Sequence, residues 1–357
     1  MSLNLEATPM ITKLAPYFFG FLLALVGALV AQWLNSPLPW LIGPLLVTAI
    51  SSMSGLKTRS HNLFRNMGQW VIGTTLGLYF SPQMVQTIVQ NTPYIITGLL
   101  FALLLGIFNA LALRQWGRID FKTAWFAGAI GGASEMANLA ERYKARVDSV
   151  ASAHSLRVLM VVIIIPFTFK FLGIQGNSID PNVSSYHFDG LGFIGLIALT
   201  VCAGLVFKRL NIPNPWVLGP LLIAALLTSN SIHFSHLPPE VSKLGQLFIG
   251  WSLGSKYGPD FFSRAPRFLS VVALVNSVAL CLAAGFAYLL SLLSDIPLST
   301  LILSVSPGGI TEMTITAKVL MLGAPMVAAF HVTRMVFILL VTQPLYKIIS
   351  KWLERRA

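Results

Sequence analysis

Apolar segments long enough to cross a bilayer follow one another along nearly the whole of this chain. Of its 357 residues, 55% are hydrophobic and only 10% are charged, whereas a soluble domain carries about 25% charged residues. A bilayer core of about 30 Å needs roughly 20 apolar residues in a helix. We therefore expect an all-α polytopic integral membrane protein. The same composition excludes a disordered chain, because disordered chains are poor in apolar residues.

Hydropathy gives the positions of the expected segments. They lie at residues 15–35, 38–53, 67–80, 92–113, 122–140, 149–173, 190–207, 214–230, 244–256, 268–292, 298–320 and 325–346. Lys13 precedes the first of them without a small-residue cleavage site, so this segment is expected to be retained and not removed as a signal. Cys202 and Cys281 both lie in apolar runs, where we expect inert core positions and no disulfide framework.

The second half of the chain repeats the first. The segment PWLIGPLL at residues 39–46 recurs as PWVLGPLL at 215–222, an offset of 176. At an offset of 177, Gly68, Gln69, Gly73, Gly77, Pro82, Gly131, Gly132, Glu135, Met136, His154 and Arg157 recur as Gly245, Gln246, Gly250, Gly254, Pro259, Gly308, Gly309, Glu312, Met313, His331 and Arg334. Shared composition repeats leucines but not this order of residue types. We predict two homologous membrane repeats, residues 1–176 and 177–357.

The placement of Lys and Arg predicts that the two repeats are inverted in the membrane. We assume a cytoplasmic N-terminus, five crossings in each repeat and a re-entrant Gly-Gly segment. The cytoplasmic side then holds 19 of the 24 Lys and Arg, namely Lys13, Lys57, Arg59, Arg65, Arg114, Arg118, Lys122, Arg142, Lys144, Arg146, Lys208, Arg209, Lys256, Arg264, Arg267, Lys347, Lys351, Arg355 and Arg356. The loop at 174–189 has none and is expected outside.

Of two equivalent loops in the repeats, one is basic and the other is not. Parallel repeats would place both loops on the same side of the membrane, so Lys and Arg would no longer be concentrated on one side. The formal net charge of +12 is thereby explained without nucleic acid as a partner. We expect a multi-pass protein of the bacterial inner membrane with both termini in the cytoplasm.

The repeated Gly-Gly segments are the best candidates for a functional site. Gly-Gly breaks a helix and frees backbone groups, which membrane proteins tolerate only where protein or water surrounds them. Helices broken at matching positions of two repeats point to the midplane site of a transporter. New helices are expected to begin at Ala133 and Ile310, with Ser134 and Thr311 as N-caps. The predicted solute-binding residues are Gly131, Gly132, Ser134, Glu135, His154, Arg157, Gly308, Gly309, Thr311, Glu312, His331 and Arg334.

The charged residues near these breaks have two interpretations. A carboxylate inside the membrane, such as Glu135, is a candidate for proton or cation coupling. The alternative is an ion pair with the arginine of the next segment, Glu135 with Arg157 and Glu312 with Arg334. Each histidine precedes its arginine by three residues and therefore shares its helix face.

The repeated motifs Pro-Trp-x-x-Gly-Pro-Leu-Leu, Gly-Gln-x-x-x-Gly-x-x-x-Gly and Gly-Gly-x-x-Glu-Met resemble those of the bacterial AbrB family of membrane proteins. The resemblance covers nearly the whole chain, and internal duplication defines that family. It implies one of two roles, because members are labelled either as regulators of aidB expression or as ammonia monooxygenases. It implies no set of catalytic residues. A soluble DNA-binding regulator shares the name, and this hydrophobic chain does not resemble it.

We interpret the sequence as a secondary transporter-like protein for a small, anionic solute, with proton or cation coupling and an indirect effect on gene expression. The alternative is a membrane sensor that acts through a soluble partner. A monooxygenase needs clustered metal ligands, and of the six histidines only His233 and His236 are close in sequence. We therefore expect no enzyme activity, no cofactor and no direct nucleic-acid binding. The bilayer and the solute are the expected partners, and a homodimer is left open.

Overall fold

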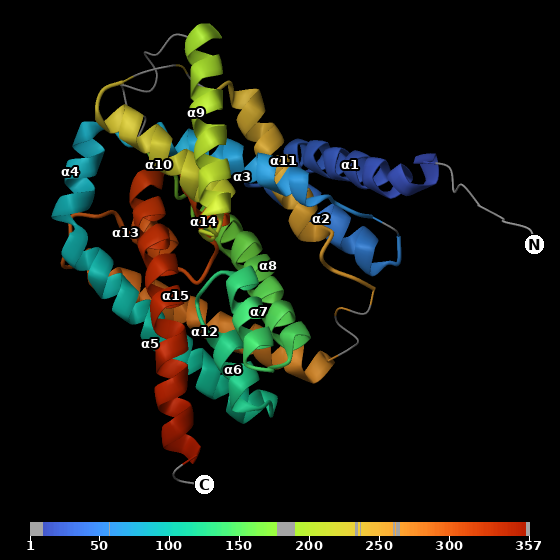
Figure 1. The fold of residues 1–357 in the computed structure, drawn as a ribbon, viewed down its shortest axis with the longest axis vertical. Helices are drawn as coiled ribbons and strands as arrows, with labels where there is room; N and C mark the ends of the chain where they lie inside the picture. The colour runs from blue at the N-terminus through green and yellow to red at the C-terminus, as the bar shows by residue number, and fades with distance from the viewer. Residues whose placement is uncertain are drawn as a thin grey trace, which may run out of the picture. The chain divides into compact units, whose positions relative to one another are not determined.

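The computed structural model describes residues 10–56, 58–176, 190–232, 235, 237–259, 261 and 265–354. In this part of the chain the protein consists of fifteen α-helices without a strand (Figure 1). They are α1 (Met10–Trp33), α2 (Pro39–Met53), α3 (Asn62–Gly77), α4 (Pro82–Gln90), α5 (Thr92–Gly117), α6 (Phe121–Gly128), α7 (Ala133–Arg142), α8 (Val147–Phe171), α9 (Gly190–Arg209), α10 (Pro215–Ser229), α11 (Pro239–Gly254), α12 (Pro266–Ser291), α13 (Leu298–Val305), α14 (Ile310–Val319) and α15 (Ala324–Glu354).

Six of these helices are long and apolar enough to cross a membrane, which confirms the polytopic all-α class. They are α1, α5, α8, α9, α12 and α15. The helices α2 and α10 are apolar but shorter. The expectation that both cysteines lie in the core was wrong, because Cys202 and Cys281 are exposed on α9 and α12. In a membrane-spanning helix an apolar run faces lipid as readily as it faces protein.

Two expected segments each proved to be two helices. The segment 122–140 is divided into α6 and α7, and the segment 298–320 into α13 and α14. Hydropathy averages over the four-residue break in each and therefore could not show it. The nine-residue α4 was not predicted, because its apolar residues are too few for a hydropathy segment. Most of the loop predicted to be outside, residues 177–189, and both His233 and His236 lie outside the described residues.

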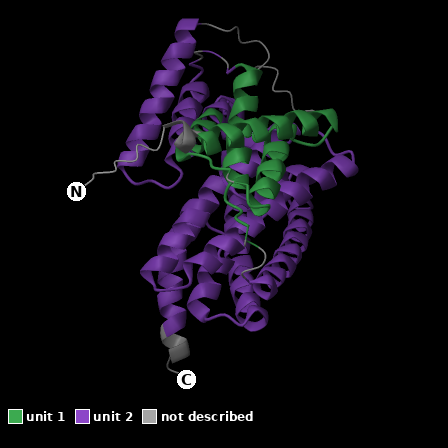
Figure 2. Cartoon of the chain, turned by 90° about the vertical axis from the view of Figure 1, so that its right-hand side faces the viewer, with its two compact units in different colours: residues 1–71, 238–264 green, residues 72–237, 265–357 purple. Residues whose placement is uncertain are grey.

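The chain divides into two compact units (Figure 2). Unit 1 comprises residues 1–71 and 238–264, and unit 2 comprises residues 72–237 and 265–357. Each unit draws on both predicted repeats. The division into repeats at residue 176 describes the sequence, and it stays a prediction for the structure.

Glycines bring the helices of unit 1 into close contact. An ideal Cβ atom on Gly250 of α11 would lie 2.3 Å from the carbonyl oxygen of Leu41 in α2, and one on Gly254 would lie 2.5 Å from that of Leu45. A third glycine, Gly68 of α3, would meet the backbone of Gly245 at 2.6 Å. Only glycine permits these approaches, as small residues do at other membrane helix crossings.

Unit 2 contains the same kind of crossing between other helices. An ideal Cβ atom on Gly73 of α3 would lie 2.4 Å from the carbonyl oxygen of Val217 in α10, and one on Gly77 would lie 2.6 Å from that of Leu221. These two glycines correspond in the sequence repeat to the pair on α11. The first repeat therefore supplies α2 to a crossing in unit 1 and α3 to the equivalent crossing in unit 2.

The long helices α5 and α12 run antiparallel through unit 2. Phe268 near the start of α12 packs at the end of α5, beside Gly117. At the other end of unit 2, the hydroxyl of Tyr94 in α5 donates to the carbonyl oxygen of Leu293 just after α12. Between these ends, the rings of Phe101 and Phe286 stack with their centroids 4.1 Å apart. These contacts define two opposite ends of unit 2, one at Gly117 and one at Tyr94.

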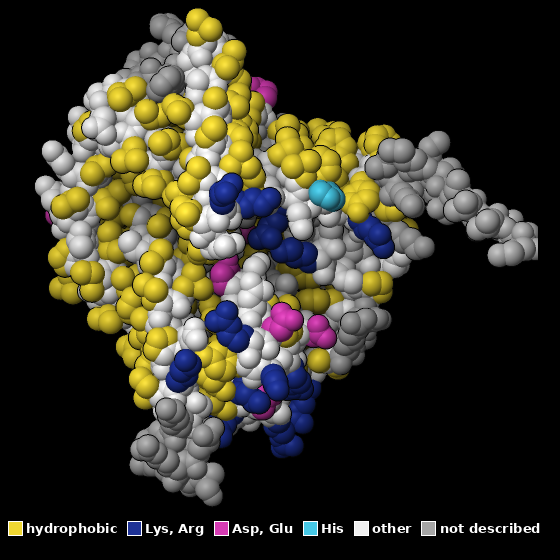
Figure 3. Space-filling view, in the orientation of Figure 1, with side chains coloured by type: hydrophobic (Ala, Val, Ile, Leu, Met, Phe, Trp, Pro, Cys, Tyr) yellow, Lys and Arg dark blue, Asp and Glu magenta, His cyan; other side chains and the backbone are white. Residues whose placement is uncertain are grey.

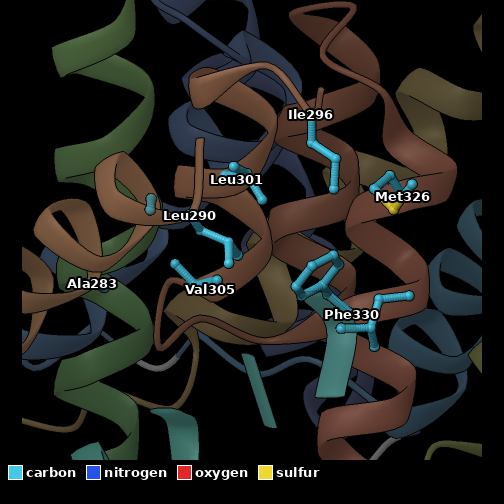
Figure 4. Packing of buried hydrophobic residues seen from close by; sticks show 9 residues of the cluster. Ala283, Leu290, Ile296, Leu301, Val305, Met326 and Phe330 are labelled. Carbon is cyan, nitrogen blue, oxygen red and sulfur yellow. The ribbon is translucent and has the colours of Figure 1, made fainter. Parts of the chain in front are cut away.

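A compact apolar cluster fills unit 2 towards the Tyr94 end (Figure 4). Four segments supply its members: α5, α12, the helix α13 with the loop before it, and α15. The cluster consists of Ile95, Ala283, Ala287, Leu290, Ile296, Leu301, Val305, Met326 and Phe330. It holds α13 against the long helices and so positions the break that follows α13.

Candidate functional site

The first Gly-Gly segment forms a helical hairpin that enters and leaves unit 2 at the Gly117 end. The chain runs inward along α6, breaks at residues 129–132 and returns along α7. After α7, the backbone N–H of Arg146 donates to the hydroxyl of Thr123 at the start of α6, with N and Oγ1 3.1 Å apart. The ring of Phe126 in α6 also packs against that of Tyr143 at the end of α7, with their centroids 5.6 Å apart. The segment therefore folds back on itself as a hairpin, and its re-entrant course in the membrane stays a prediction.

The second hairpin, α13 and α14, enters unit 2 from the opposite end. It begins five residues after Leu293, which accepts the hydrogen bond from Tyr94. After α14, the chain returns to its starting point, where the hydroxyl of Thr300 donates to the carbonyl oxygen of Leu322 at 3.0 Å. The two hairpins therefore point towards each other from opposite ends of unit 2.

The motif Gly-Gly-x-x-Glu-Met has a packing reason at each break. The side chain of Met136 covers Gly131, so that a Cβ atom there would lie 2.9 Å from Cε of the methionine. The carboxylate of Glu135 lies over Gly132, where a Cβ atom would be 2.0 Å from Oε2. At the second break Met313 covers Gly308 and Glu312 lies over Gly309 in the same way. Both glycines of each pair therefore leave room for side chains of the following helix.

The predicted helix starts at Ala133 and Ile310 are confirmed, but the predicted N-caps were wrong. Gly132 is the N-cap of α7 and Gly309 that of α14, which places Ser134 and Thr311 at the second helical position. Each glutamate is then the third residue of its helix, and its carboxylate folds back over the N-cap residue. A carboxylate here complements the positive end of the helix dipole, as in one half of a capping box.

Arg157 of α8 binds the broken backbone at the other side of the first break. Its Nη1 donates to the carbonyl oxygen of Ala129 at 2.9 Å and its Nη2 to that of Gly131 at 3.3 Å. Nη2 also lies 2.7 Å from Nδ1 of His154. Because an arginine can only donate, this histidine nitrogen must accept. His154 is therefore neutral, and its Nε2 donates to the carbonyl oxygen of Phe126 at 2.9 Å.

The second break has the same arrangement. Arg334 of α15 donates to the carbonyl oxygens of Ser306 at 2.6 Å and Gly308 at 2.5 Å. It also donates to Nδ1 of His331 at 2.8 Å, while Nε2 of His331 donates to the carbonyl oxygen of Leu303 at 2.9 Å. We call each arginine, with its histidine and the carbonyls they bind, a carbonyl clasp.

The carbonyl clasp at the first break corrects the expectation of an ion pair between Glu135 and Arg157. Within the described part of the chain, the guanidinium of Arg157 bonds to backbone carbonyls and to His154, and no ion pair joins it to Glu135. The positive arginine faces the carbonyl end of α6, and the negative glutamate lies at the N–H end of α7. Each charge thus complements one end of a broken helix.

The two breaks contact each other's neighbouring helices in a reciprocal way. Gly131 packs against Ile338 of α15, with 3.3 Å from its ideal Cβ atom to Cγ2. Gly308 packs against Val161 of α8, with 2.9 Å to Cγ1. Ile338 and Val161 are themselves equivalent in the sequence repeat. The structure thus brings the predicted residues of both repeats into one region of unit 2.

Asp120 fixes the entrance of the first hairpin, and the sequence analysis did not single it out. Its carboxylate caps α6 by accepting from the backbone N–H of Thr123 at 3.0 Å, and it pairs with Nε of Arg146 at 3.6 Å. Burial alone would raise the pKa of Asp120. The hydrogen bonds from Thr123 and the charge of Arg146 outweigh this effect, so the pKa lies below its usual 3.8.

Basic side chains gather at the Gly117 end of unit 2, seen at the bottom of Figure 3. The exposed ones are Arg114, Arg118, Lys122, Arg142, Lys144, Arg146, Arg267 and Lys347. All of them belong to the set that the charge pattern assigns to the cytoplasm. The inner-membrane location and the orientation stay predictions.

Comparison with known proteins gives one consistent family. The family model described as "Transition state regulatory protein AbrB" matches residues 40–350. A relative from Escherichia coli (strain K12) with the name "Putative regulator AbrB" is 26% identical over 322 residues, which cover 90% of this chain and 92% of the relative. "Uncharacterized protein YhjN" from Bacillus subtilis (strain 168) is 26% identical over 360 residues, covering 92% of this chain and 90% of the relative. The repeated motifs, the membrane-type helices and this match show that the chain belongs to the AbrB family.

Proposed function

We propose that this protein is a secondary transporter-like carrier of the bacterial inner membrane for a small anionic solute. The observation that carries the proposal is the pair of hairpins that enter unit 2 from opposite ends, with their breaks in reciprocal contact. Non-helical backbone at membrane depth is tolerated where it lines a cavity or is buried in protein. Helices broken at matching positions of two inverted repeats place substrate sites in many secondary transporters.

The charges near the breaks support an anion as the solute. Arg157 and Arg334 are buried, and each lies beside a break, so an anion held next to either guanidinium would lower its electrostatic energy. The helices α7 and α14 direct their N-terminal N–H groups towards the breaks. Glu135 and Glu312 now lie over these N-termini. Protonating either glutamate would reduce its competition with an incoming anion, which is a physical basis for proton coupling.

A membrane regulator is the second candidate. The name "Putative regulator AbrB" of the relative favours it, and the exposed basic end of unit 2 would suit an acidic region of a soluble partner. An indirect effect on gene expression is compatible with both candidates, since a carrier changes the concentration of its solute. Neither candidate is an enzyme.

Net flux separates the two candidates. Purified protein in lipid vesicles would be given labelled glycolate, acetate or succinate, with a pH gradient imposed across the membrane. A carrier produces uptake above protein-free vesicles for at least one anion, and the double substitution Glu135→Gln and Glu312→Gln removes the dependence of that uptake on pH. Arg142→Gln, an exposed change at the end of α7, is the matched control. No uptake of any anion under either gradient direction would contradict the carrier.

A further inference from the structure

The internal repeat builds a ring of four helices twice within unit 2. In the first ring α5 packs against α6 and α12, and α8 packs against the same two helices. In the second ring α12 packs against α13 and α5, and α15 packs against the same two. Each ring thus includes one inward-running helix of a hairpin, α6 in the first and α13 in the second. We call them ring 1 and ring 2.

The two rings differ in what fills them. The apolar cluster of Figure 4 fills ring 2 with side chains such as Leu301, Val305 and Phe330. Ring 1 contains two buried asparagines instead, Asn109 of α5 and Asn276 of α12, with 2% and 5% of their surface exposed. At the offset of 177, Asn109 of α5 corresponds to Phe286 of α12, which packs against the apolar cluster. The buried asparagines therefore belong to ring 1, and the residue equivalent to Asn109 is apolar.

The two asparagines lie at the same level of ring 1. Leu105 of α5, Ala279 of α12 and Ile130 of the first break belong to one buried cluster. Asn109 follows Leu105 by about one helical turn, and Asn276 precedes Ala279 by about one turn on the antiparallel helix. Both asparagines are thus displaced from this cluster in the same direction, towards the Gly117 end.

Three polar groups in ring 1 lack an adequate partner. The amide nitrogen of Asn109 lies 3.4 Å from the carbonyl oxygen of Gly128, but its Oδ1 is buried and accepts no hydrogen bond from the described residues. Nε of Arg157 is likewise buried without an acceptor there. The amide nitrogen of Asn276 reaches only the sulfur of Met160, at 4.0 Å. A thioether sulfur is a weak acceptor.

We propose that ring 1 is the binding site of the carried solute and that the solute is a short hydroxycarboxylate. A carboxylate would accept from Nε of Arg157 and the amide of Asn276, and a neighbouring hydroxyl would donate to Oδ1 of Asn109. Buried polar groups are ordinarily hydrogen-bonded. The two donors without a good acceptor call for an acidic oxygen in the ligand, and the acceptor without a donor calls for a hydroxyl. This inference rests on the proposed function and adds that one site, near the first hairpin, serves the whole chain.

Binding of glycolate and acetate to the purified full-length protein tests the proposal. The two probes share a carboxylate, and only glycolate has the hydroxyl that Asn109 would accept from. We expect glycolate to bind about tenfold more tightly than acetate, which is the effect of one hydrogen bond to a buried group. Asn109→Ala should abolish this preference, and Asn276→Ala should weaken both probes about tenfold.

Folding does not confound this test. Alanine removes an amide that is poorly satisfied and has a higher helix propensity than asparagine, so neither variant should melt at a lower temperature than the wild type. Ser304→Ala is the matched control. It removes a buried hydroxyl of α13 in ring 2, which bonds only within its own helix to the carbonyl oxygen of Thr300. It should leave both affinities unchanged.

The outcomes separate this site from the proposed function. Equal affinities in the wild type, a preference that survives Asn109→Ala, or no binding of either probe would overturn ring 1 as the site. If vesicles take up glycolate but Asn109→Ala still binds glycolate more tightly than acetate, the protein is a carrier and its solute binds outside ring 1. If the variants bind as expected but vesicles take up no anion, ring 1 binds the solute and the protein is not a carrier.

Discussion

At the scale of single residues, the repeated charges complete a broken backbone. The sequence predicted that His154 and Arg157 share a helix face, and the 2.7 Å contact between their side chains confirms it. It did not predict that Arg157 binds the carbonyl oxygen of Ala129, 28 residues earlier. That contact depends on the return of the hairpin beside α8, which local periodicity does not contain. The sequence therefore showed which residues matter at the break but not what they bind.

Removing an arginine from its clasp should destabilise the protein. In Arg334→Gln, the buried carbonyl oxygens of Ser306 and Gly308 lose their donors. Unsatisfied buried groups cost about 1–3 kcal/mol each, so we expect a loss of about 3 kcal/mol. Thermal unfolding in detergent measures it, with the exposed Arg142→Gln as control. Equal melting temperatures for the two variants would show that the clasp is dispensable.

Asp120 should give the first hairpin a dependence on acid pH. Its pKa is below 3.8 in the folded protein, so its stabilising effect is present above pH 3.8 and is lost as the pH falls through the folded pKa. The wild type should therefore melt above Asp120→Asn at neutral pH, and the gap should close as the pH falls below about 4. A gap that stays constant down to pH 3 would contradict this role. Melting curves of both proteins from pH 3 to 7 decide it.

At the scale of helices, glycine positions set the crossings, and their spacing in the sequence indicates them. The spacing of Gly73 and Gly77, repeated by Gly250 and Gly254, is the small-xxx-small pattern of close packing, and the contacts confirm it. The sequence could not show which helices these glycines meet. The partners are α10 for the first pair and α2 for the second. Each partner comes from the other repeat, and a spacing within one helix carries no information on that choice.

Alanine at the equivalent glycines should therefore destabilise the two crossings alike. In Gly73→Ala and in Gly250→Ala the new methyl group would meet a backbone oxygen at 2.4 and 2.3 Å, respectively. The helices must separate, which we expect to cost about 1–3 kcal/mol in each case.

Gly285→Ala is the control for this pair, because nothing lies within 4 Å of its ideal Cβ atom in α12. Helix propensity alone should make this variant as stable as the wild type or more stable by up to about 1 kcal/mol. Thermal unfolding of the three variants compares them. A large loss for one crossing glycine without the other would contradict their equivalence.

At the scale of the whole molecule, the repeat in the sequence and the units of the structure are different divisions. Hydropathy predicted the membrane class, and the hydrogen bond from Arg146 to Thr123 shows that the first Gly-Gly segment folds back as a hairpin. That this hairpin is re-entrant in the membrane stays a prediction. The sequence did not predict that units 1 and 2 each combine parts of both repeats. It also did not single out Asn109 and Asn276, because an asparagine without a repeated counterpart carries no signal in a comparison of the two halves.

The two hairpins, residues 121–142 and 298–319, are expected to enter from opposite faces of the membrane. Single cysteines answer this directly, after Cys202 and Cys281 are replaced by serine. One is introduced by Lys144→Cys beside the first hairpin and the other by Asp295→Cys before the second, and both positions are exposed. A membrane-impermeant thiol reagent is then applied to intact cells and to inverted membrane vesicles. We expect Asp295→Cys to react only in intact cells and Lys144→Cys only in inverted vesicles. Reaction of both cysteines from the same side would show that the two hairpins enter from one face of the membrane.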